Sequence, residues 1–367
     1  MKESSMNITF IVGNGFDCGL GLETDYRSFI RWYLQQPASD KKSAQKMRSI
    51  IKRDIDTWAD AEMAMAALPF SEFGGDVRNV AMECAHDFSW YLSEYIKSKE
   101  RLALLPQKRS VLSRLQEQFG KFFLDVFYDG DFCCFPWENV PKNGIVYINI
   151  VSLNYSHILD RLLPRVPVDY RDSETGNVCA IKFLPVCHLH GEIGAGSQSV
   201  SFGVGYKDQI VDANLRRYSS RFGYLLKPKY DTEFNYGKYM RVQEKIRDSE
   251  CVVIFGTSLG RSDLYLWIMI LQEFFKNQRH GGSMKILYSA FESKYEGIPE
   301  TVDFQDKTDR MFCQYLDEYG EMPGMKDDLM DALFTVGVGP FKSPDGTTAF
   351  FDPLRLGWLK RELKVVK

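Results

Sequence analysis

The stretch ITFIV at residues 8–12, followed by GNGFD at residues 13–17, decides the fold class of this chain. Apolar and β-branched residues in unbroken succession are typical of a strand that is buried on both faces of a parallel sheet. The two glycines that follow lack Cβ atoms, so a phosphate or ribose can approach the backbone, and a helix that starts there aims N–H groups at an anion. The stretch therefore predicts an α/β sheet with a nucleotide at its first strand-to-helix turn.

Three more apolar runs of strand length, at residues 145–151, 251–255 and 285–288, are each followed by Gly, Asn or Ser. They predict further buried strands of the same parallel sheet. Residues 40–130 instead carry apolar positions at helical spacing, and a hairpin turn is expected at residues 172–177.

These patterns predict a nucleotide-binding α/β core and an inserted helical segment. The expected segments are the core at 1–29 and 141–300, the helical insertion at 30–140, and a C-terminal extension that packs on the core at 301–367. The aromatic-rich insertion is where we expect regulation or oligomerisation to act, and a homo-oligomer is expected.

Composition excludes several classes of function. The 367 residues contain 46 Lys and Arg against 49 Asp and Glu, a formal net charge of −3, so there is no general basic character to bind nucleic acid or an anionic membrane. The apolar run near the N-terminus is roughly five to six residues long, which is too short for a membrane span or a signal-peptide core. The sequence predicts a cytoplasmic globular protein with no membrane partner.

Eight cysteines are present without any C-x-x-C pair, and several lie in apolar runs. This spacing predicts buried free thiols and no structural zinc. The cysteines are Cys18, Cys84, Cys133, Cys134, Cys179, Cys187, Cys251 and Cys313.

Four strand ends carry polar motifs. Because the carboxyl ends of parallel strands meet at one edge of a sheet, we expect these motifs to converge on one ligand site. They are GNGFD at 13–17, SLNYS at 152–156, CHLHG at 187–191 and GTSLGRSD at 256–263.

Each motif also has a purely structural explanation. His188 and His190, two residues apart, would share one face of a strand, where a histidine is usually a hydrogen-bonded structural residue, and Arg27 would be a solvated charge. Helix capping would account for five other side chains, which are Asp17, Asn154, Ser156, Ser262 and Asp263.

The set of motifs and its order resemble the bacterial AbiH abortive-infection family. The position of Thr257 departs from that family, which more often has His there. The matching residues are GNGFD at 13–17, Gly21, Leu22, Thr24, Tyr26, Phe29, Trp58, Glu62, Asn154, Tyr155, HLHG at 188–191, Gly256, Ser258, Leu259, Gly260, Ser262 and Asp263.

A more distant resemblance is to sirtuins and sirtuin-like NAD hydrolases, which present similar motifs in the same order around NAD. The similar segments here are GNG at 13–15, NYS at 154–156, His190 with Gly191, and GTSL at 256–259. This resemblance implies a sirtuin-like Rossmann parallel sheet with a helical insertion. Asp17 replaces a small hydroxyl residue, Ser156 replaces an Asp, and the four-cysteine zinc module is missing, so the resemblance favours hydrolysis of the nucleotide over protein deacylation.

The two resemblances together imply an anti-phage protein that, when triggered, hydrolyses NAD to nicotinamide and ADP-ribose, with no metal. His190 would be the general base and Asn154 the orienting group. A phage-derived trigger or partner protein is expected. The implied nucleotide contacts are Gly13, Asn14, Gly15, Asp17, Tyr26, Gly256, Thr257 and Ser258.

Two alternatives stay open on the sequence. One is a module that senses a nucleotide without cleaving it and passes a signal through the helical insertion. The other is a metal-dependent nuclease or phosphodiesterase with four candidate residues, which are Asp17, His188, His190 and Asp263.

Overall fold

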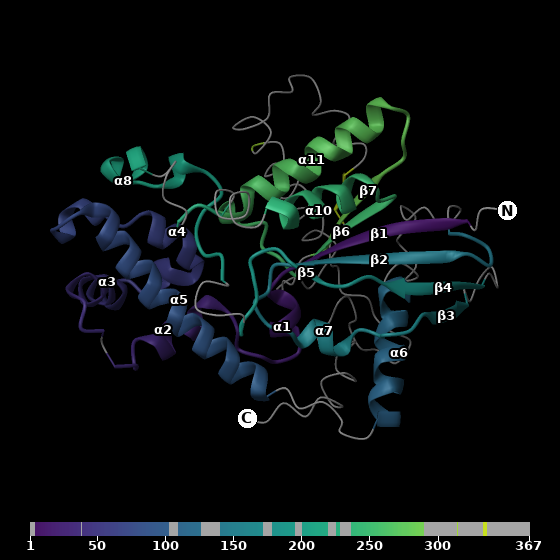
Figure 1. The fold of residues 1–367 in the computed structure, drawn as a ribbon, viewed down its shortest axis with the longest axis horizontal. Helices are drawn as coiled ribbons and strands as arrows, with labels where there is room; N and C mark the ends of the chain where they lie inside the picture. The colour runs from purple at the N-terminus through teal and green to yellow at the C-terminus, as the bar shows by residue number, and fades with distance from the viewer. Residues whose placement is uncertain are drawn as a thin grey trace, which may run out of the picture.

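The computed structural model describes residues 4–37, 39–102, 109–125, 140–171, 178–194, 200–218, 225–227, 236–289, 314 and 333–335. Within them an eight-stranded sheet runs in the order β3-β4-β2-β1-β6-β7-β8, and the short β5 pairs with β2 (Figure 1). The strands are β1 (Ser5–Val12), β2 (Ile145–Ser152), β3 (Val168–Arg171), β4 (Val178–Phe183), β5 (Cys187–His188), β6 (Cys251–Phe255), β7 (Lys285–Ser289) and β8 (Leu333–Thr335).

The four strands predicted from apolar runs form the centre of this sheet as β1, β2, β6 and β7, and they are parallel. The predicted α/β architecture with a largely parallel sheet is therefore confirmed. Their carboxyl ends are aligned, because Val12 pairs with both Ser152 and Phe255. The segments that follow these strands consequently emerge at one edge of the sheet.

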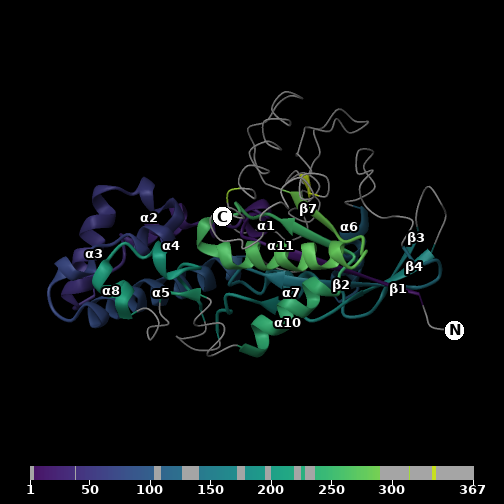
Figure 2. The same cartoon turned by 90° about the horizontal axis from the view of Figure 1, so that it is seen from above.

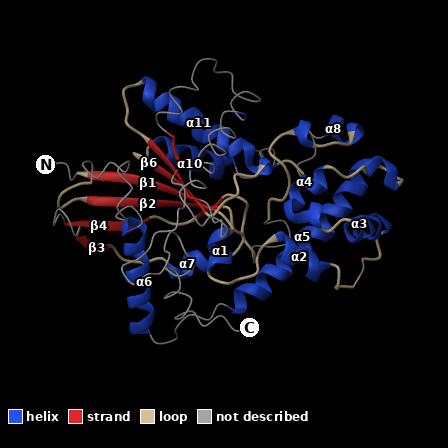
Figure 3. Cartoon of the chain, turned by 180° about the vertical axis from the view of Figure 1, so that it is seen from behind, coloured by secondary structure: helices blue, strands red, loops and turns tan. Residues whose placement is uncertain are grey.

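Helices cover both faces of the sheet, because alternate side chains of each buried strand point to opposite sides. On one face, Phe10 packs edge-on against Phe123 of α6 (Arg109–Asp125) at a ring-centroid distance of 4.8 Å. On the other face, Ile11 joins the core formed by α10 (Tyr236–Arg247) and α11 (Leu264–Arg279). Figure 3 shows the sheet in red with helices on both sides.

A second core lies beyond the carboxyl edge of the sheet and is built mainly from helices (Figures 1 and 2). We call it the helical lobe and define it as the described residues of 26–102 and 193–227. Its helices are α2 (Tyr26–Tyr33), α3 (Lys42–Arg53), α4 (Ala61–Ala66), α5 (Val77–Leu102) and α8 (Ala213–Tyr218), with 3-10 turns at Asp56–Asp60, Phe70–Phe73 and Lys207–Gln209.

Aromatic side chains fill the core of the helical lobe. Phe88 contacts Phe29 and Phe202 at centroid distances of 5.0 and 4.9 Å, which joins the later segment 193–227 to the helices before it. The helix α6 lies within the expected insertion 30–140 but packs on the sheet, because Leu115 and Phe119 belong to the sheet core. The helical segment of the sequence is thus divided between two cores.

The expected hairpin is represented by its two strands, since β3 and β4 are antiparallel and Arg171 pairs with Val178. The turn itself, residues 172–177, lies outside the described residues. Of the expected C-terminal extension 301–367, the description covers Gln314 and β8, which pairs with β7 in parallel. The rest of the extension also lies outside the described residues.

The predicted burial of cysteines is confirmed for Cys84, Cys179 and Cys251. Cys18 differs, because its side chain in the short helix α1 (Gly15–Gly19) is exposed. Cys133, Cys134 and Cys313 lie outside the described residues. No helix among the described residues combines the length and the apolar character that a bilayer span requires.

Candidate functional site

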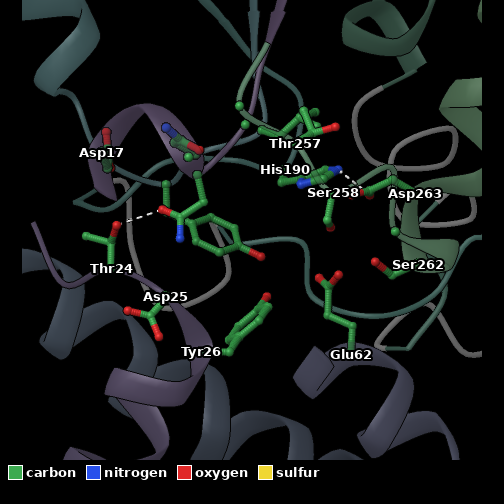
Figure 4. A pocket seen from close by; sticks show the side chains of 18 of the residues that line it. Asp17, Thr24, Asp25, Tyr26, Glu62, His190, Thr257, Ser258, Ser262 and Asp263 are labelled. Carbon is green, nitrogen blue, oxygen red and sulfur yellow. Dashed lines mark hydrogen bonds and ion pairs between the residues drawn. The ribbon is translucent and has the colours of Figure 1, made fainter. Parts of the chain in front are cut away.

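A cavity of about 670 Å³ lies where the carboxyl edge of the sheet faces the helical lobe, and all ten residues selected from the sequence line it. Figure 4 shows Tyr26, Asp25 and Glu62 on the lobe side, opposite Asp17, His190, Thr257 and Ser258. The ten are Gly13, Asn14, Gly15, Asp17, Tyr26, Asn154, His190, Gly256, Thr257 and Ser258. Aligned parallel strands bring these distant positions together, as expected for an open α/β sheet.

The glycines at 13 and 15 are required by a close approach of two loops. A Cβ atom on Gly13 would lie 2.6 Å from Thr257 Cγ2, and one on Gly15 would lie 2.7 Å from the carbonyl oxygen of Gly256. Gly256 itself has a φ of +65°, which favours glycine. The sequence interpretation attributed these glycines to ligand approach, whereas contact between the loops is sufficient to explain them.

The N–H groups of the glycine turn are largely satisfied within the chain. Gly13 donates to the carbonyl oxygen of Phe255 at 2.8 Å, Gly15 donates to that of Gly256 at 2.7 Å, and Phe16 donates to that of Gly13 at 3.1 Å. The helix α1 that follows spans five residues only. The expected cradle of free N–H groups for a phosphate is therefore not formed by these three residues.

At one end of the cavity the carboxyl group of Asp17 is buried with one hydrogen-bond donor. Its Oδ2 accepts from Ser156 Oγ at 2.6 Å, while its Oδ1 has no partner within the described part of the chain. Burial raises the pKa of Asp17 to about 6, against the opposing effect of the Ser156 hydrogen bond. This carboxyl group can thus carry a proton close to neutral pH.

The amide of Asn154 lines the same cavity and is 5 % exposed. Neither its oxygen nor its nitrogen has a hydrogen-bond partner among the described residues. A buried amide without partners is costly, so such a group usually has a water or a ligand beside it. Asn154 is therefore suited to orient a bound molecule.

At the other end, His190 faces an ion cluster. Its Nε2 lies 3.0 Å from Oδ1 of Asp263 (Figure 4), although the two do not meet the geometry of a hydrogen bond. The same oxygen accepts from Lys227 Nζ at 2.7 Å. Lys227 also donates to Glu62 Oε2 at 2.7 Å. Burial alone would raise the pKa of Asp263, but the charges of Lys227 and His190 hold it well below its usual range.

His188 and His190 do not share a strand face as the sequence suggested. The strand β5 ends at His188, and the chain then turns with Gly191 at a φ of +83°. His188 lies near Asp160 on α7 (Ile158–Leu162), with its Nε2 at 2.9 Å from Asp160 Oδ2 and its Nδ1 at 3.1 Å from the carbonyl oxygen of Asn154. His188 is thus held structurally, while His190 lines the cavity.

Helix capping does not explain the polar side chains of the site. Asp263 begins α11 and His157 begins α7, and neither uses its side chain as a cap. Asp17 lies inside the first turn of α1 and is engaged by Ser156. With capping removed as an explanation, a ligand-binding role gains weight for Asp17, Asn154 and Asp263.

Several residues that line the cavity were given no role from the sequence. Glu62 was among the motif residues that resemble the AbiH family, and no other feature of the sequence indicated a role for it. Tyr155 was also among these motif residues, whereas nothing pointed to Lys227, which lies in a segment without periodicity. Tyr155 donates its hydroxyl to the carbonyl oxygen of Ser201 at 3.2 Å.

Acidic residues outnumber basic ones in the lining of the cavity. Among the described residues that line it, Lys227 is the sole Lys or Arg. The carboxylate residues that line it are Asp17, Asp25, Asp60, Glu62 and Asp263. No group of three or more His, Cys, Asp or Glu that could hold a metal ion is found among the described residues, so the four residues of the nuclease alternative do not form such a group.

The fold and the cavity define the protein as an α/β protein with a cavity at the carboxyl edge of a largely parallel sheet. The chain belongs to the family described as bacteriophage abortive infection AbiH, whose model matches residues 9–281. This match runs from β1 to the end of α11 and confirms the AbiH resemblance of the sequence. None of the curated proteins matches the chain.

Proposed function

We propose that the protein acts in abortive infection by hydrolysing NAD to nicotinamide and ADP-ribose through a sirtuin-like site. The observation that carries the proposal is the acidic cavity, in which the unpartnered amide of Asn154 and the His190–Asp263 pair occur together. The bond between ribose and nicotinamide breaks through an oxocarbenium-like state, which is cationic at the ribose carbon. Fixed carboxylates in a partly enclosed site stabilise such a charge.

In this mechanism a water molecule adds to the ribose carbon while the bond to nicotinamide breaks. The electron pair of that bond stays on the ring nitrogen, so nicotinamide leaves as a neutral molecule. The water gives up its proton to His190. We place the proton of neutral His190 on Nε2, because this nitrogen lies 3.0 Å from the carboxylate of Asp263 although the two do not complete a hydrogen bond, and this leaves Nδ1 as the proton acceptor.

The remaining residues position the reactants. The side-chain oxygen and nitrogen of Asn154 have no hydrogen-bond partner among the described residues, and we assign them to hold a ribose hydroxyl and the water. Asp17, with its raised pKa, can share a hydrogen bond with a second hydroxyl at either protonation state. Gly13, Gly15 and Gly256 would make van der Waals contacts with the nucleotide rather than hydrogen bonds, because the N–H groups of Gly13 and Gly15 already donate within the chain.

The direct test is nicotinamide release from NAD by purified protein, with and without a chelator. Release that resists the chelator supports the proposal. Binding of NAD without release would favour the nucleotide-sensing module, and chelator-sensitive cleavage of nucleic acid would favour the nuclease.

Because an abortive-infection protein is expected to be silent until triggered, the same test is needed in infected cells. NAD would be measured through a phage infection in cells that make the parent protein or its His190→Ala variant. A fall in NAD with the parent only is the expected result. An equal NAD level in both strains, under an infection that the parent aborts, would overturn NAD hydrolysis as the activity.

A further inference from the structure

The helical lobe contributes a carboxylate to the centre of the cavity. Glu62 in α4 is 4 % exposed, and Figure 4 shows its side chain pointing from the lobe toward Ser258 and His190. Its Oε2 accepts from Lys227, whereas its Oε1 is buried and has no partner within the described part of the chain. An unpaired carboxylate oxygen in such a place costs free energy unless a ligand approaches it.

Two tyrosine rings line the cavity beside Glu62. Burial, and then the negative charge of Glu62, raise the pKa of both Tyr26 and Tyr155 well above the usual value of a phenol. Tyr26, Tyr155 and Glu62 all line this cavity, and Figure 4 shows Tyr26 beside Glu62. Both tyrosines are neutral at physiological pH, and the faces of neutral aromatic rings attract cations.

A second observation points to a ligand at the same place. Asn154, which is next to Tyr155 in the chain, lines the cavity with both amide atoms unpartnered among the described residues. The site therefore offers a carboxylate oxygen, two aromatic rings and a free amide. Lys227 brings one positive charge against the two carboxylates that it contacts, Glu62 and Asp263, so it offsets only part of their negative charge.

We infer that this part of the cavity binds a flat aromatic cation, with Glu62 as the counter-ion and Tyr26 and Tyr155 beside the ring. The inference rests on the proposed function in one respect, since it takes this cation to be the pyridinium half of NAD. The site would then select the oxidised dinucleotide, because the reduced ring carries no charge. It also gives the helical lobe a direct part in substrate recognition.

The test measures binding of two small probes to the full chain by calorimetry or ligand-observed NMR. 1-Methylnicotinamide is the cationic probe, and nicotinamide is its neutral counterpart with the same ring and carboxamide. The parent is expected to bind the cation at least about tenfold more tightly, a difference that corresponds to about 1.4 kcal/mol. In Glu62→Gln, which keeps an oxygen for Lys227 but loses the charge, the preference should fall to about threefold or less.

The control variant is Glu117→Gln, in which an exposed carboxylate on α6 is changed, because no described residue of α6 lines the cavity. It should keep the preference of the parent. Equal affinity of the parent for both probes would overturn the inference, even if Glu62→Gln failed to fold. A preference that persists in folded Glu62→Gln would equally overturn it.

The outcomes separate this inference from the proposed function. A protein that prefers the cation but never releases nicotinamide from NAD would support the aromatic-cation site and contradict the hydrolase. A protein that hydrolyses NAD without any preference for the cationic probe would support the hydrolase and contradict the site.

Discussion

Asp17 and Asp263 lie at opposite ends of one cavity and differ in the state that their surroundings favour (Figure 4). Burial dominates at Asp17, whose neighbouring donors, the hydroxyl of Ser156 and the amide of Asn154, are neutral, so its pKa rises to about 6. Burial acts in the same direction at Asp263, but Lys227 and His190 outweigh it and the pKa falls. The comparison teaches that the charged partner, more than depth of burial, separates a carboxyl group that takes up a proton near pH 6 from one that stays ionised.

The largest expected effect is on the rate of nicotinamide release, and it comes from the end of the cavity that holds Asp263 and His190. His190→Ala removes the proposed proton acceptor but leaves the rest of the cavity intact, so nicotinamide release should fall by about 10²- to 10⁴-fold while NAD binding changes little. Asn154→Ala should lose turnover similarly. His188→Ala is the control, because His188 contacts Asp160 outside the cavity and should act through stability. Parent-like turnover in His190→Ala would refute the assigned mechanism.

The next effect tests the ion cluster itself. Lys227→Met leaves the carboxylates of Glu62 and Asp263 buried without their shared cation, so the free energy of unfolding should drop by about 3–5 kcal/mol. Urea unfolding measures this drop. Lys97→Met, which breaks an exposed pair with Glu94, should change stability little. Similar unfolding curves for the two variants would mean that the cluster is not the stabilising partner of Asp263.

The proton-bearing end is tested by the pH dependence of stability. Between about pH 4 and 6 the folded protein keeps a proton on Asp17 that the unfolded chain has lost, so the free energy of unfolding falls as the pH rises through this window. A shift from 3.8 to about 6 corresponds to about 3 kcal/mol. Asp17→Asn should lack this fall, and the difference between the two proteins isolates Asp17 from other groups. A constant difference across this pH range would show that the pKa of Asp17 is not raised.

The smallest effect concerns the contact between the loop that follows β1 and the loop that follows β6. Gly15→Ala places a Cβ atom 2.7 Å from the carbonyl oxygen of Gly256, which should cost about 1–3 kcal/mol of stability. Gly237→Ala in α10 is the matched control, since no atom lies within 4 Å of its added Cβ and a helical alanine is favourable. Unchanged stability of Gly15→Ala with lost NAD binding would restore ligand approach as the reason for this glycine.

Much of the scaffold could be predicted from the sequence because buried parallel strands are locally encoded. The apolar runs at 8–12, 145–151, 251–255 and 285–288 all became neighbouring strands. Once four strands are parallel, their polar ends must meet at one edge. This is why nine of the ten chosen residues line one cavity, while the tenth, Tyr26, reaches it from α2 in the helical lobe.

The ion cluster could not be predicted in this way. Glu62, Lys227 and Asp263 come from the lobe, from an aperiodic segment and from the start of α11, and no local spacing relates them. Their meeting depends on how the lobe packs against the sheet edge. The same is true of the two histidines, which differ in surroundings because β5 ends at His188.

The sequence by itself determined the α/β class, the membership of the AbiH family and the edge of the sheet where a ligand would bind, because apolar periodicity and motif order are properties of the chain alone. Only the tertiary structure decided which polar groups are free. Backbone bonds occupy the N–H groups of Gly13 and Gly15, whereas the amide of Asn154 has no partner among the described residues. Hydrogen bonds and ion pairs depend on distances of a few ångströms between segments far apart in sequence, and packing of the whole molecule sets those distances.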